Sequence, residues 1–363
     1  METPYIRVHK QIVKENIQRM QDDANNQGIA LRPHCKTHKT PEIAFWQLEA
    51  GAKGITVAKI SEANVMFEAG ITDIFIAYPI VTDDKIANVI ALCKKANITL
   101  AVDSVFGANK LAEAAKREGM VLNVRLEVDT GLNRAGARSE KVIEVARSIH
   151  NDSHLCLDGI FTFKGAVVEE KSTLDTSAAG EEEVLRLQQY KARLAEEGIS
   201  VPVISAGSTP TAQAVSKTRN VEEIRPGTYV FNDAMQYKLG VCELHQCAAS
   251  VVVTIVSLHD DDRLAVIDGG SKTFATDIQP NQEPLRLNGF GIVIGHPDAV
   301  FLRMNEEHGI VQLGENHGLN IGDTIEIIPN HICSTVNLHN HFYVEDERGE
   351  TTKIRVAARG CLQ

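Results

Sequence analysis

Apolar, β-branched stretches alternate with helix-like stretches from about residue 30 to residue 235. Short apolar runs bounded by glycine, proline or polar residues are typical of buried strands. The strands predicted in this way are Ala30–Lys36, Gly54–Ala58, Asp73–Tyr78, Ile98–Asp103, Leu122–Asp129, Leu157–Phe163, Pro202–Ala206 and Glu223–Phe231. Helical patterns fill the intervals, among them Ser61–Gly70, Asp83–Ala96, Ala108–Gly119 and Gly180–Gly198. Strand–helix alternation favours a parallel sheet, and eight strands are the number that closes a TIM barrel. We therefore expect an α/β chain built on a (β/α)8 barrel.

The pattern of apolar and polar residues changes after about residue 245. No long helical pattern follows, and short β-branched segments are separated by glycine, proline or asparagine, so a β domain is expected there. These segments are Ala248–Val256, Arg263–Asp268, Ile310–Leu313 and Asp323–Ile328. We place the barrel at residues 1–245 and the β domain at residues 246–363. A strand at Tyr5–Val8 is expected to join the β domain, so residues 1–20 are candidates for packing on it.

Composition and charge are those of a globular protein that binds neither nucleic acid nor membranes. Of 363 residues, 43% are hydrophobic and 23% are charged, with a formal net charge of −11. A negative field repels nucleic acid and anionic membranes. No apolar run approaches the roughly 20 residues that cross a bilayer, and the first residues lack the apolar core of a signal peptide. The seven cysteines are scattered and form no CxxC pair, which favours a reducing cytoplasm.

The segment LRPHCKTHK at Leu31–Lys39 is the most informative in the chain. Alternate residues of a strand share a face, so Arg32, His34, Lys36 and His38 would point the same way. Inward positions of a barrel normally carry Val, Ile and Leu, whereas a cationic inward face at the end of a strand is typical of an active-site mouth. Neighbouring cations also favour the neutral, nucleophilic form of a lysine. The plain alternative is a solvated basic run in a loop.

A second candidate is the turn Ser205–Thr211, which follows the apolar run Val201–Ile204 and precedes the helix-compatible Thr211–Lys217. Small hydroxyl residues at a strand-to-helix turn present backbone N–H groups and a positive helix end to an anion. TIM barrels often bind phosphate at such a turn, although many turns carry Gly and Ser merely to turn and to cap. The motifs GxGxxG and GxxxxGK[ST] are missing, which disfavours a dinucleotide fold or a P-loop.

Four motifs in the barrel, taken together, resemble the alanine-racemase-like, fold type III pyridoxal-phosphate enzymes. They are RPHCK at Arg32–Lys36, VDTGLNRAG at Val128–Gly136, GSTP at Gly207–Pro210 and EIRPGTY at Glu223–Tyr229. The resemblance implies an alanine-racemase-like TIM barrel with pyridoxal 5′-phosphate bound to Lys36 as a Schiff base. It also implies that Arg134 approaches the phenolic oxygen of the cofactor and that Arg225 faces its pyridine nitrogen.

The same resemblance implies further site residues. The residues assigned to the phosphate are Gly207, Ser208, Thr209, Gly227 and Thr228. Tyr229 is a further cofactor-binding candidate, although a tyrosine near a barrel rim also serves packing. His34 and His38 are catalytic candidates that would orient Lys36 or shuttle protons, and simple structural roles are the alternative.

Three C-terminal segments narrow the resemblance to the D-threonine aldolase/D-serine dehydratase family. They are Asp268–Phe274, Glu306–Gly309 and Pro329–Asn337. In that family the histidine of an HxC or HxD motif holds a metal, which puts His331 and Cys333 forward. Imidazole and thiolate suit zinc better than magnesium, and two protein ligands leave positions open for substrate and water. Asp268 and Lys272 fit a turn as readily as a site.

One departure from the family follows the sixth strand. The chain reads FTFKGAV at Phe161–Val167, where the family often has an aromatic residue and a Gly-His or Gly-Asn pair. The side chain of Ala166 cannot donate a hydrogen bond or act as an acid or a base. Either Lys164 compensates, or the substrate differs.

The resemblance implies a lyase that depends on pyridoxal phosphate and a divalent metal. Its substrates would be small D-β-hydroxy amino acids, as for a D-serine dehydratase or a D-threonine aldolase. The metal would act on the β-hydroxyl, and Lys36 would be the base for dehydration. Two alternatives remain. A racemase of this fold would use a second base from the β domain, and a non-catalytic cofactor-binding protein would lack that domain. A homodimer is expected by resemblance.

Overall fold

The structure is a computed structural model that describes residues 1–259 and 261–363. By compactness the chain divides into two units, and neither is continuous in sequence. We call them the barrel unit, which comprises Arg19–Lys36, Pro41–Gly227 and Cys361–Gln363, and the β unit, which comprises Met1–Gln18, Thr37–Thr40 and Thr228–Gly360. The domain boundary expected at residue 245 stays a prediction. Among the described residues, no helix is both long enough and apolar enough to cross a membrane.

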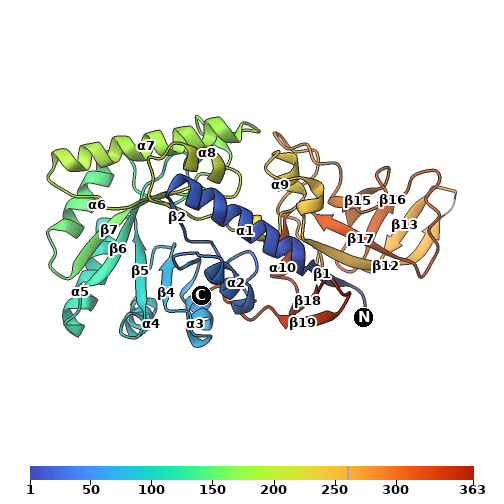
Figure 1. The fold of residues 1–363 in the computed structure, drawn as a ribbon, viewed down its shortest axis with the longest axis horizontal. Coiled ribbons are helices and arrows are strands. Elements are labelled where there is room, and N and C mark those ends of the chain that lie inside the picture. The colour runs from blue at the N-terminus through green and yellow to red at the C-terminus, as the bar shows by residue number, and fades with distance from the viewer. Residues whose placement is uncertain (260) are drawn as a thin grey trace. The chain divides into compact units, whose positions relative to one another are not determined.

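The barrel unit is built on an eight-stranded sheet with the strand order β2-β11-β10-β7-β6-β5-β4-β3 (Figure 1). Every pair of neighbouring strands in this order is parallel. The strands are β2 (Ala30–Leu31), β3 (Ile55–Val57), β4 (Asp73–Ile76), β5 (Asn97–Val102), β6 (Leu122–Glu127), β7 (Leu155–Phe161), β10 (Ile204–Ala206) and β11 (Glu223–Ile224). All eight strands expected from the sequence are present.

The two ends of this strand order are joined by hydrogen bonds between β3 and the segment after β2. The Thr56 N–H donates to Pro33 O at 2.8 Å, the Cys35 N–H donates to Thr56 O at 2.8 Å, and His34 and Thr56 form a parallel bridge. The sheet therefore curls round to meet itself, which confirms the expected TIM-barrel-like fold.

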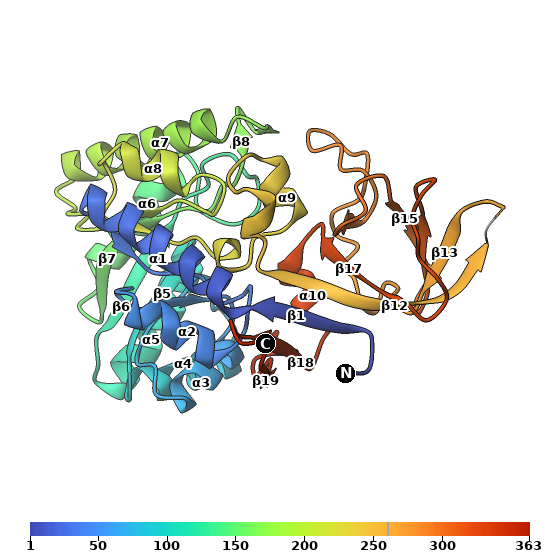
Figure 2. The same cartoon turned by 45° about the vertical axis from the view of Figure 1, so that its right-hand side comes forward.

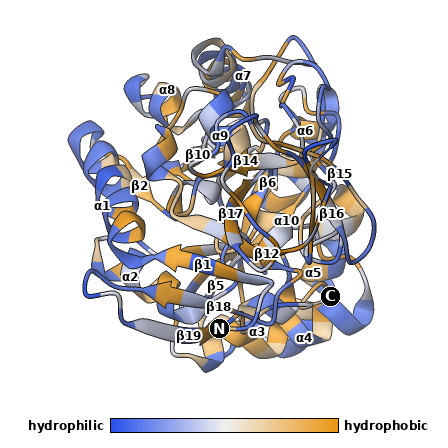
Figure 3. Cartoon of the chain, turned by 90° about the vertical axis from the view of Figure 1, so that its right-hand side faces the viewer, coloured by the Kyte–Doolittle hydropathy of each residue, from blue (hydrophilic) through white to orange (hydrophobic). Residues whose placement is uncertain are grey.

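Helices follow the strands and cover the outside of the sheet (Figure 1). They are α1 (Lys10–Gln27), α2 (Pro41–Glu49), α3 (Ile60–Glu68), α4 (Asp83–Cys93), α5 (Val105–Glu118), α6 (Glu140–His150), α7 (Thr176–Glu196) and α8 (Ala212–Lys217). A short hairpin, β8 (Val167–Val168) and β9 (Lys171–Ser172), precedes α7. Local sequence fixes several helix ends: the Ser104 side chain caps α5, and Asp175 caps α7. The surface helices carry both hydrophilic and hydrophobic segments, as amphipathic helices do (Figure 3).

The two faces of the barrel strands differ in chemistry. Outward-facing residues belong to the apolar core shared with the helices, for example Ile55, Ile74, Leu100, Val124, Leu126, Ile160, Ile204 and Ile224. The alternate residues face the barrel interior, because successive side chains of a strand point to opposite faces. They include Thr56, Phe75, Ala101, Arg125, Phe161, Ser205 and Glu223, all buried. The interior is thus unusually polar for a fold whose inner layers are normally aliphatic.

The β unit is dominated by a nine-stranded sheet. Its strands are β1 (Tyr5–His9), β12 (Ala249–His259), β13 (Leu264–Ile267), β14 (Gly291–Val293), β15 (Val300–Met304), β16 (Gly309–Gln312), β17 (Thr324–Pro329), β18 (His341–Glu345) and β19 (Thr351–Arg355). The strand expected at Tyr5–Val8 is β1, which lies between β12 and β18 (Figure 2). Two short helices, α9 (Ala234–Lys238) and α10 (Ile332–Val336), complete the unit.

The first and the last predicted barrel strands end five and seven residues before their expected last residues, Lys36 and Phe231. The first stops at Leu31, and residues 35–38 form a turn, so the expectation that Arg32, His34, Lys36 and His38 share one strand face is wrong. The last barrel strand stops at Ile224, and Thr228–Val230 form a 3-10 helix instead. In each case a proline, Pro33 or Pro226, follows within two residues. A proline has no N–H to donate to the sheet, which interrupts the strand.

Candidate active site

Three segments that follow barrel strands bring Lys36, Arg134 and Phe163 together. Lys36 Nζ lies 4.9 Å from the centroid of the Phe163 ring, and the guanidinium carbon of Arg134 lies 4.8 Å from the same centroid. Cations favour the face of an aromatic ring. Lys36 follows β2, Arg134 follows β6 and Phe163 follows β7, so this is the C-terminal end of the barrel, where enzymes of this fold hold their active sites. The sequence analysis quoted Phe163 but gave it no role.

Arg225 is fixed in the same unit by the protein itself. Its Nη2 donates to Thr162 O at 2.6 Å, and its Nη1 donates to Ser205 Oγ. Burial lowers the pKa of the Arg225 guanidinium to about 10, although Glu223 opposes the shift. The side chain therefore remains a cation at neutral pH, and its orientation is set before any ligand binds.

Glu127, at the end of β6, is a further candidate site residue that none of the sequence motifs singled out. Its side chain is 4% exposed, and its Oε2 has no hydrogen-bond partner among the described residues. Burial raises the pKa of Glu127 to about 7; Arg134 and Arg225 lower it, whereas Asp103 and Asp129 raise it further. A signal was present in the sequence, because Asn123, Arg125 and Glu127 place polar residues at every second position of an otherwise apolar strand.

The turn after β10 is the segment that was expected to present backbone N–H groups to a phosphate. The Gly207 N–H donates to Glu183 Oε1 at 3.0 Å, and the Ser208 N–H donates to Thr211 Oγ1 at 3.0 Å. These two N–H groups are thus bonded within the protein, and the phosphate-binding role expected of Gly207, Ser208 and Thr209 stays a prediction. Gly207 has a φ of +79°, and a Cβ there would lie 3.1 Å from Ile224 Cγ2, which explains the glycine. Thr209 is buried.

The two candidate histidines near Lys36 bond to backbone of their own turn. His34 Nδ1 accepts the Lys36 N–H at 3.3 Å, and His38 Nδ1 accepts the Thr40 N–H at 3.1 Å. An accepting Nδ1 leaves the proton of a neutral imidazole on Nε2. Both rings therefore help to shape the turn that carries the lysine, and their catalytic role stays a prediction.

Lys164 and the remaining candidates have identifiable partners. Lys164 is buried, and its Nζ donates to Glu182 Oε2 at 2.5 Å, so it is held by α7. Tyr229 is buried within the 3-10 helix Thr228–Val230. Asp268 accepts hydrogen bonds from Thr3 and from the Thr254 N–H, and Lys272 pairs with Glu307 at 2.6 Å on the surface.

In the β unit, His331 and Cys333 lie at the start of α10 with a defined set of neighbours. His331 Nδ1 lies 2.6 Å from Asp277 Oδ2, which also accepts the Ser334 hydroxyl at 3.0 Å. Cys333 Sγ lies 3.1 Å from Thr37 Oγ1 and 3.4 Å from Thr228 Oγ1. A carboxylate on Nδ1 fixes the ring and leaves Nε2 for a metal, as is usual for metal-binding histidines. Asp277 lies 54 residues from His331, so no local pattern could have revealed it.

The charge states of this pair are coupled. Burial lowers the pKa of His331, but the Cys333 thiolate and Asp277 outweigh burial and raise it to about 11. Burial raises the pKa of Cys333, but His331 outweighs burial and lowers it. The proximity of His331 therefore favours the thiolate of Cys333, which is the form of cysteine that binds metals.

Asp233 ties the two short helices of the β unit together. Its Oδ2 accepts the Ile332 N–H at 3.0 Å, and its Oδ1 accepts the Gln236 N–H at 2.9 Å. Asp233 is fully buried, and it thereby anchors the start of α10 beside α9. Among residues 1–259 and 261–363, no three His, Cys, Asp or Glu side chains are grouped so that they could hold a metal ion. The donor set that the structure offers is one imidazole nitrogen and one thiolate.

Comparison with known proteins places this architecture in a family. The family model "Alanine racemase, N-terminal domain" matches residues 8–234, and the model "Putative serine dehydratase domain" matches residues 248–345. The chain is 32% identical over 351 residues to D-threo-3-hydroxyaspartate dehydratase of Delftia sp., covering 92% of each chain. A solved structure of that dehydratase superposes with a TM-score of 0.89 over 98% of this chain and 97% of the other, at 30% identity.

Two further relatives have related activities. The chain is 27% identical to D-threonine aldolase of Arthrobacter sp., covering 99% of this chain and 93% of the other. It is 28% identical to D-serine dehydratase of Dictyostelium discoideum, covering 95% of this chain and 93% of the other. Solved structures of the Delftia dehydratase include a histidine-to-alanine mutant and a cysteine-to-alanine mutant in the metal-free form. In that enzyme the mutated residues are two positions apart, as His331 and Cys333 are here. This chain belongs to the alanine racemase N-terminal domain family, a family of pyridoxal-phosphate-dependent folds, and to its branch with a serine dehydratase domain.

Proposed function

We propose that this member of the family is a lyase that depends on pyridoxal phosphate and a divalent metal and acts on D-β-hydroxy amino acids. We further propose dehydration, which yields a 2-oxo acid and ammonia, ahead of aldol cleavage. The observation that carries the proposal is the Cys333–His331 pair, whose imidazole is oriented by Asp277, in a chain that also gathers Lys36 and Arg134 beside one aromatic ring. The Delftia dehydratase, whose structures include a metal-free cysteine mutant, supports the same assignment.

The residues of the barrel unit fit the cofactor. A lysine for the aldehyde, an arginine cation near the same aromatic ring and a second arginine fixed by Thr162 and Ser205 match a planar, anionic ligand. The buried Glu127 oxygen without a hydrogen-bond partner indicates a site whose polar groups are completed by a ligand. When bound, pyridoxal phosphate supplies a ring that stabilises negative charge at the substrate Cα.

The protein's own residues hold and move protons around that ring. The Lys36 amine would hold the cofactor, and as a free amine it would serve as a general base for the proton on the substrate Cα. Its approach is fixed by the turn at residues 35–38, which His34 and His38 brace through their Nδ1 atoms. Arg134 and Arg225 are cations. They would therefore attract the carboxylate of an amino-acid substrate and the ring oxygen of the cofactor.

The residues of the β unit fit a divalent metal in the chemistry of their donor atoms. Thiolate and imidazole are the ligands that zinc prefers, and Asp277 holds the His331 ring in the orientation that frees Nε2. Two protein ligands leave coordination positions for substrate and water. When bound, such a metal supplies Lewis acidity toward an oxygen of the substrate. Zinc is the proposed metal.

Product identification tests the proposal. Enzyme loaded with pyridoxal phosphate and zinc is given D-serine, D-threonine and D-threo-3-hydroxyaspartate in separate reactions. A 2-oxo acid with ammonia is the expected result for at least one substrate, and glycine with an aldehyde would show an aldolase instead. Racemisation alone, unaffected by a chelator, would contradict the proposed lyase.

Two variants sharpen this test. Lys36→Ala is expected to lose the visible absorption band of the covalently bound cofactor together with activity. Cys333→Ala is expected to retain that band but to lose bound zinc, measured as metal content after dialysis. A Cys333→Ala protein that keeps full zinc content would contradict the metal assignment. A homodimer and a cytoplasmic location stay predictions, and analytical ultracentrifugation at several concentrations tests the first.

A further inference from the structure

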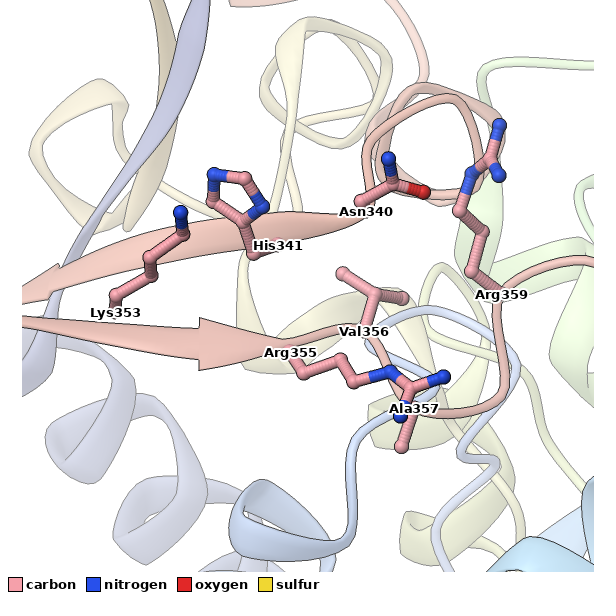
Figure 4. Close-up of a pocket in the computed structure, with 7 residues that line it drawn as sticks. All are labelled: Asn340, His341, Lys353, Arg355, Val356, Ala357 and Arg359. Atoms are coloured by element: carbon pink, nitrogen blue, oxygen red, sulfur yellow. The ribbon is translucent and has the colours of Figure 1, made fainter.

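One cavity in the β unit is bounded by cations and has no assigned role. It measures about 560 Å3 and is lined by Asn340, His341, Lys353, Arg355, Val356, Ala357 and Arg359 (Figure 4). Small-molecule sites occupy roughly 300–1,000 Å3. The lining contains three permanent cations and one histidine but no carboxylate. The chain as a whole is acidic, with 48 acidic and 37 basic residues, so a cavity lined only by positive charges requires an explanation.

Strand register explains how the cations come together. In the antiparallel β18–β19 pair, His341 lies opposite Arg355 and Tyr343 lies opposite Lys353. Residues two apart on a strand share a face, so His341, Lys353 and Arg355 project from one face of the hairpin. The opposite face, with Phe342, Val344 and Ile354, is buried in the core.

Arg359 reaches the cavity from the turn that directly follows β19. Its Nε donates to Asn337 O at 3.1 Å, and the Gly360 N–H donates to Asn337 Oδ1 at 3.3 Å. Asn337 is the residue at the C-terminal end of α10. These bonds hold Arg359 in place. One wall of the cavity is therefore an arginine side chain that is hydrogen-bonded to the backbone carbonyl of Asn337.

The cations of this cavity are not neutralised by the protein. Lys353, Arg355 and Arg359 are exposed and form no ion pair with any residue in 1–259 or 261–363, whereas other exposed cations such as Lys94, Arg138 and Arg147 do. Burial and Lys353 lower the pKa of His341, so this imidazole is uncharged at neutral pH and can donate a hydrogen bond. Two guanidinium forks and an ammonium around one cavity match the oxygens of a doubly charged anion.

A plain alternative is that the charges protect a sheet edge. β19 is the last strand in its order, and lysine on an edge strand discourages pairing with another chain. That role requires neither a cavity nor a cation beyond the strand itself, and it does not account for the hydrogen bond that holds Arg359 on Asn337. We propose that this cavity is a binding site for a small dianion, either a phosphate or a dicarboxylate.

Calorimetry on the cofactor-loaded enzyme tests the site with two probes, inorganic phosphate and malonate. Both are titrated at constant ionic strength set with potassium chloride, and acetate serves as the singly charged comparison. The expected result is saturable binding of one of the dianions, one per chain, with acetate at least ~10-fold weaker. Tight binding of phosphate alone points to a phosphorylated ligand, and tight binding of malonate points to a dicarboxylate. Wild-type protein that binds neither probe overturns the proposal.

A double variant locates the binding. Lys353→Ala/Arg355→Ala is expected to weaken the dianion at least ~10-fold. Arg303→Ala, which removes an exposed cation from β15 of the same unit, is the matched control and should bind as the wild type does. Equal binding by the double variant overturns the proposal, provided that its thermal midpoint shows it to be folded. A dianion that competes with D-serine equally in wild type and double variant lies in the active site, which also overturns it. Because calorimetry needs no turnover, failure of the proposed lyase activity is seen separately.

Discussion

Two buried carboxylates on the inner face of the barrel behave in opposite ways. Glu223, on β11, is 1% exposed, and Glu127, on β6, is 4% exposed. Burial raises the pKa of Glu223, but Arg125 and Arg32 outweigh burial and bring it to about 2. Burial raises the pKa of Glu127 to about 7, and its charged neighbours do not offset this. Similar burial on the same fold thus gives pKa values about 5 apart.

The difference lies in hydrogen-bonded partners. Glu223 accepts from Arg32 Nε at 2.8 Å, from Arg125 Nη1 at 2.5 Å and from Ser205 Oγ at 2.6 Å. Asp73 and Asp158 pair with the outer sides of the same two arginines. Glu127, at the C-terminal end of its strand, has an Oε2 that accepts no hydrogen bond from any described residue. The middle of the barrel therefore holds an ionic network in which the buried charges are paired with one another. At the end that carries Lys36, the Glu127 carboxyl group has a hydrogen-bonding position that a ligand could fill.

The largest expected effect comes from breaking the closed network. Glu223→Gln leaves Arg32 and Arg125 buried with less compensation, and breaking a buried pair typically costs about 3–5 kcal/mol. We expect the free energy of unfolding in urea to fall by that amount at pH 7. In the wild type, this stabilisation exists above the usual pKa of a glutamate and is lost as the pH falls from about 4.5 toward 2. A variant as stable as the wild type at pH 7 would contradict the network.

Glu127→Gln tests whether the buried Glu127 carboxylate destabilises the fold. The variant is expected to be more stable than the wild type at alkaline pH. The folded protein binds the Glu127 proton more tightly than the unfolded chain does, so wild-type stability falls as the pH rises from about 4.5 through 7. A glutamine removes this loss, which amounts to about 3 kcal/mol for a shift from 4.5 to about 7. Urea unfolding of the enzyme without cofactor at pH 5 and pH 8 should show the variant's advantage only at pH 8. An equal difference at both pH values would refute the assignment.

Ser205 joins the two regions, and its loss is expected to cost less. Its hydroxyl donates to Glu223 Oε1 and accepts from Arg225 Nη1. Ser205→Ala removes both bonds, which costs about 1–3 kcal/mol of stability because two buried groups lose a partner. The pH dependence of cofactor binding, followed by visible absorption, should also shift, because Arg225 loses one of its two anchors. Ser205→Thr keeps the hydroxyl and serves as the control that should restore most of both properties.

The smallest expected effect is at an exposed pair. Lys272 and Glu307 lie 2.6 Å apart, with side chains 64% and 62% exposed. Exposed pairs contribute little because water screens them and side-chain entropy opposes them. Lys272→Ala should leave the urea midpoint unchanged within error, in contrast to Glu223→Gln. A clear loss of stability or activity would show that Lys272 belongs to a site after all.

Much of the fold could be predicted because its signals are local. The eight barrel strands, the helices between them and the joining strand at Tyr5–Val8 are all present, since strand and helix periodicity follow from burial of one face. The candidate residues Lys36, Arg134 and Arg225 were found from motifs that lie within single strand–loop segments. The turn at residues 35–38 was missed because the strand pattern was extended past Pro33.

The sequence by itself determined the order of strands and helices, the family and the residue types available for chemistry. Tertiary structure alone decided which charges are paired. Glu127 and Glu223 look alike in sequence, each in a β-branched or apolar strand, but only Glu223 meets two arginines from distant strands. Asp277 meets His331 only because the chain folds back over 54 residues. Periodicity reports burial along one segment, whereas a pKa depends on the partners that packing brings within a few ångströms.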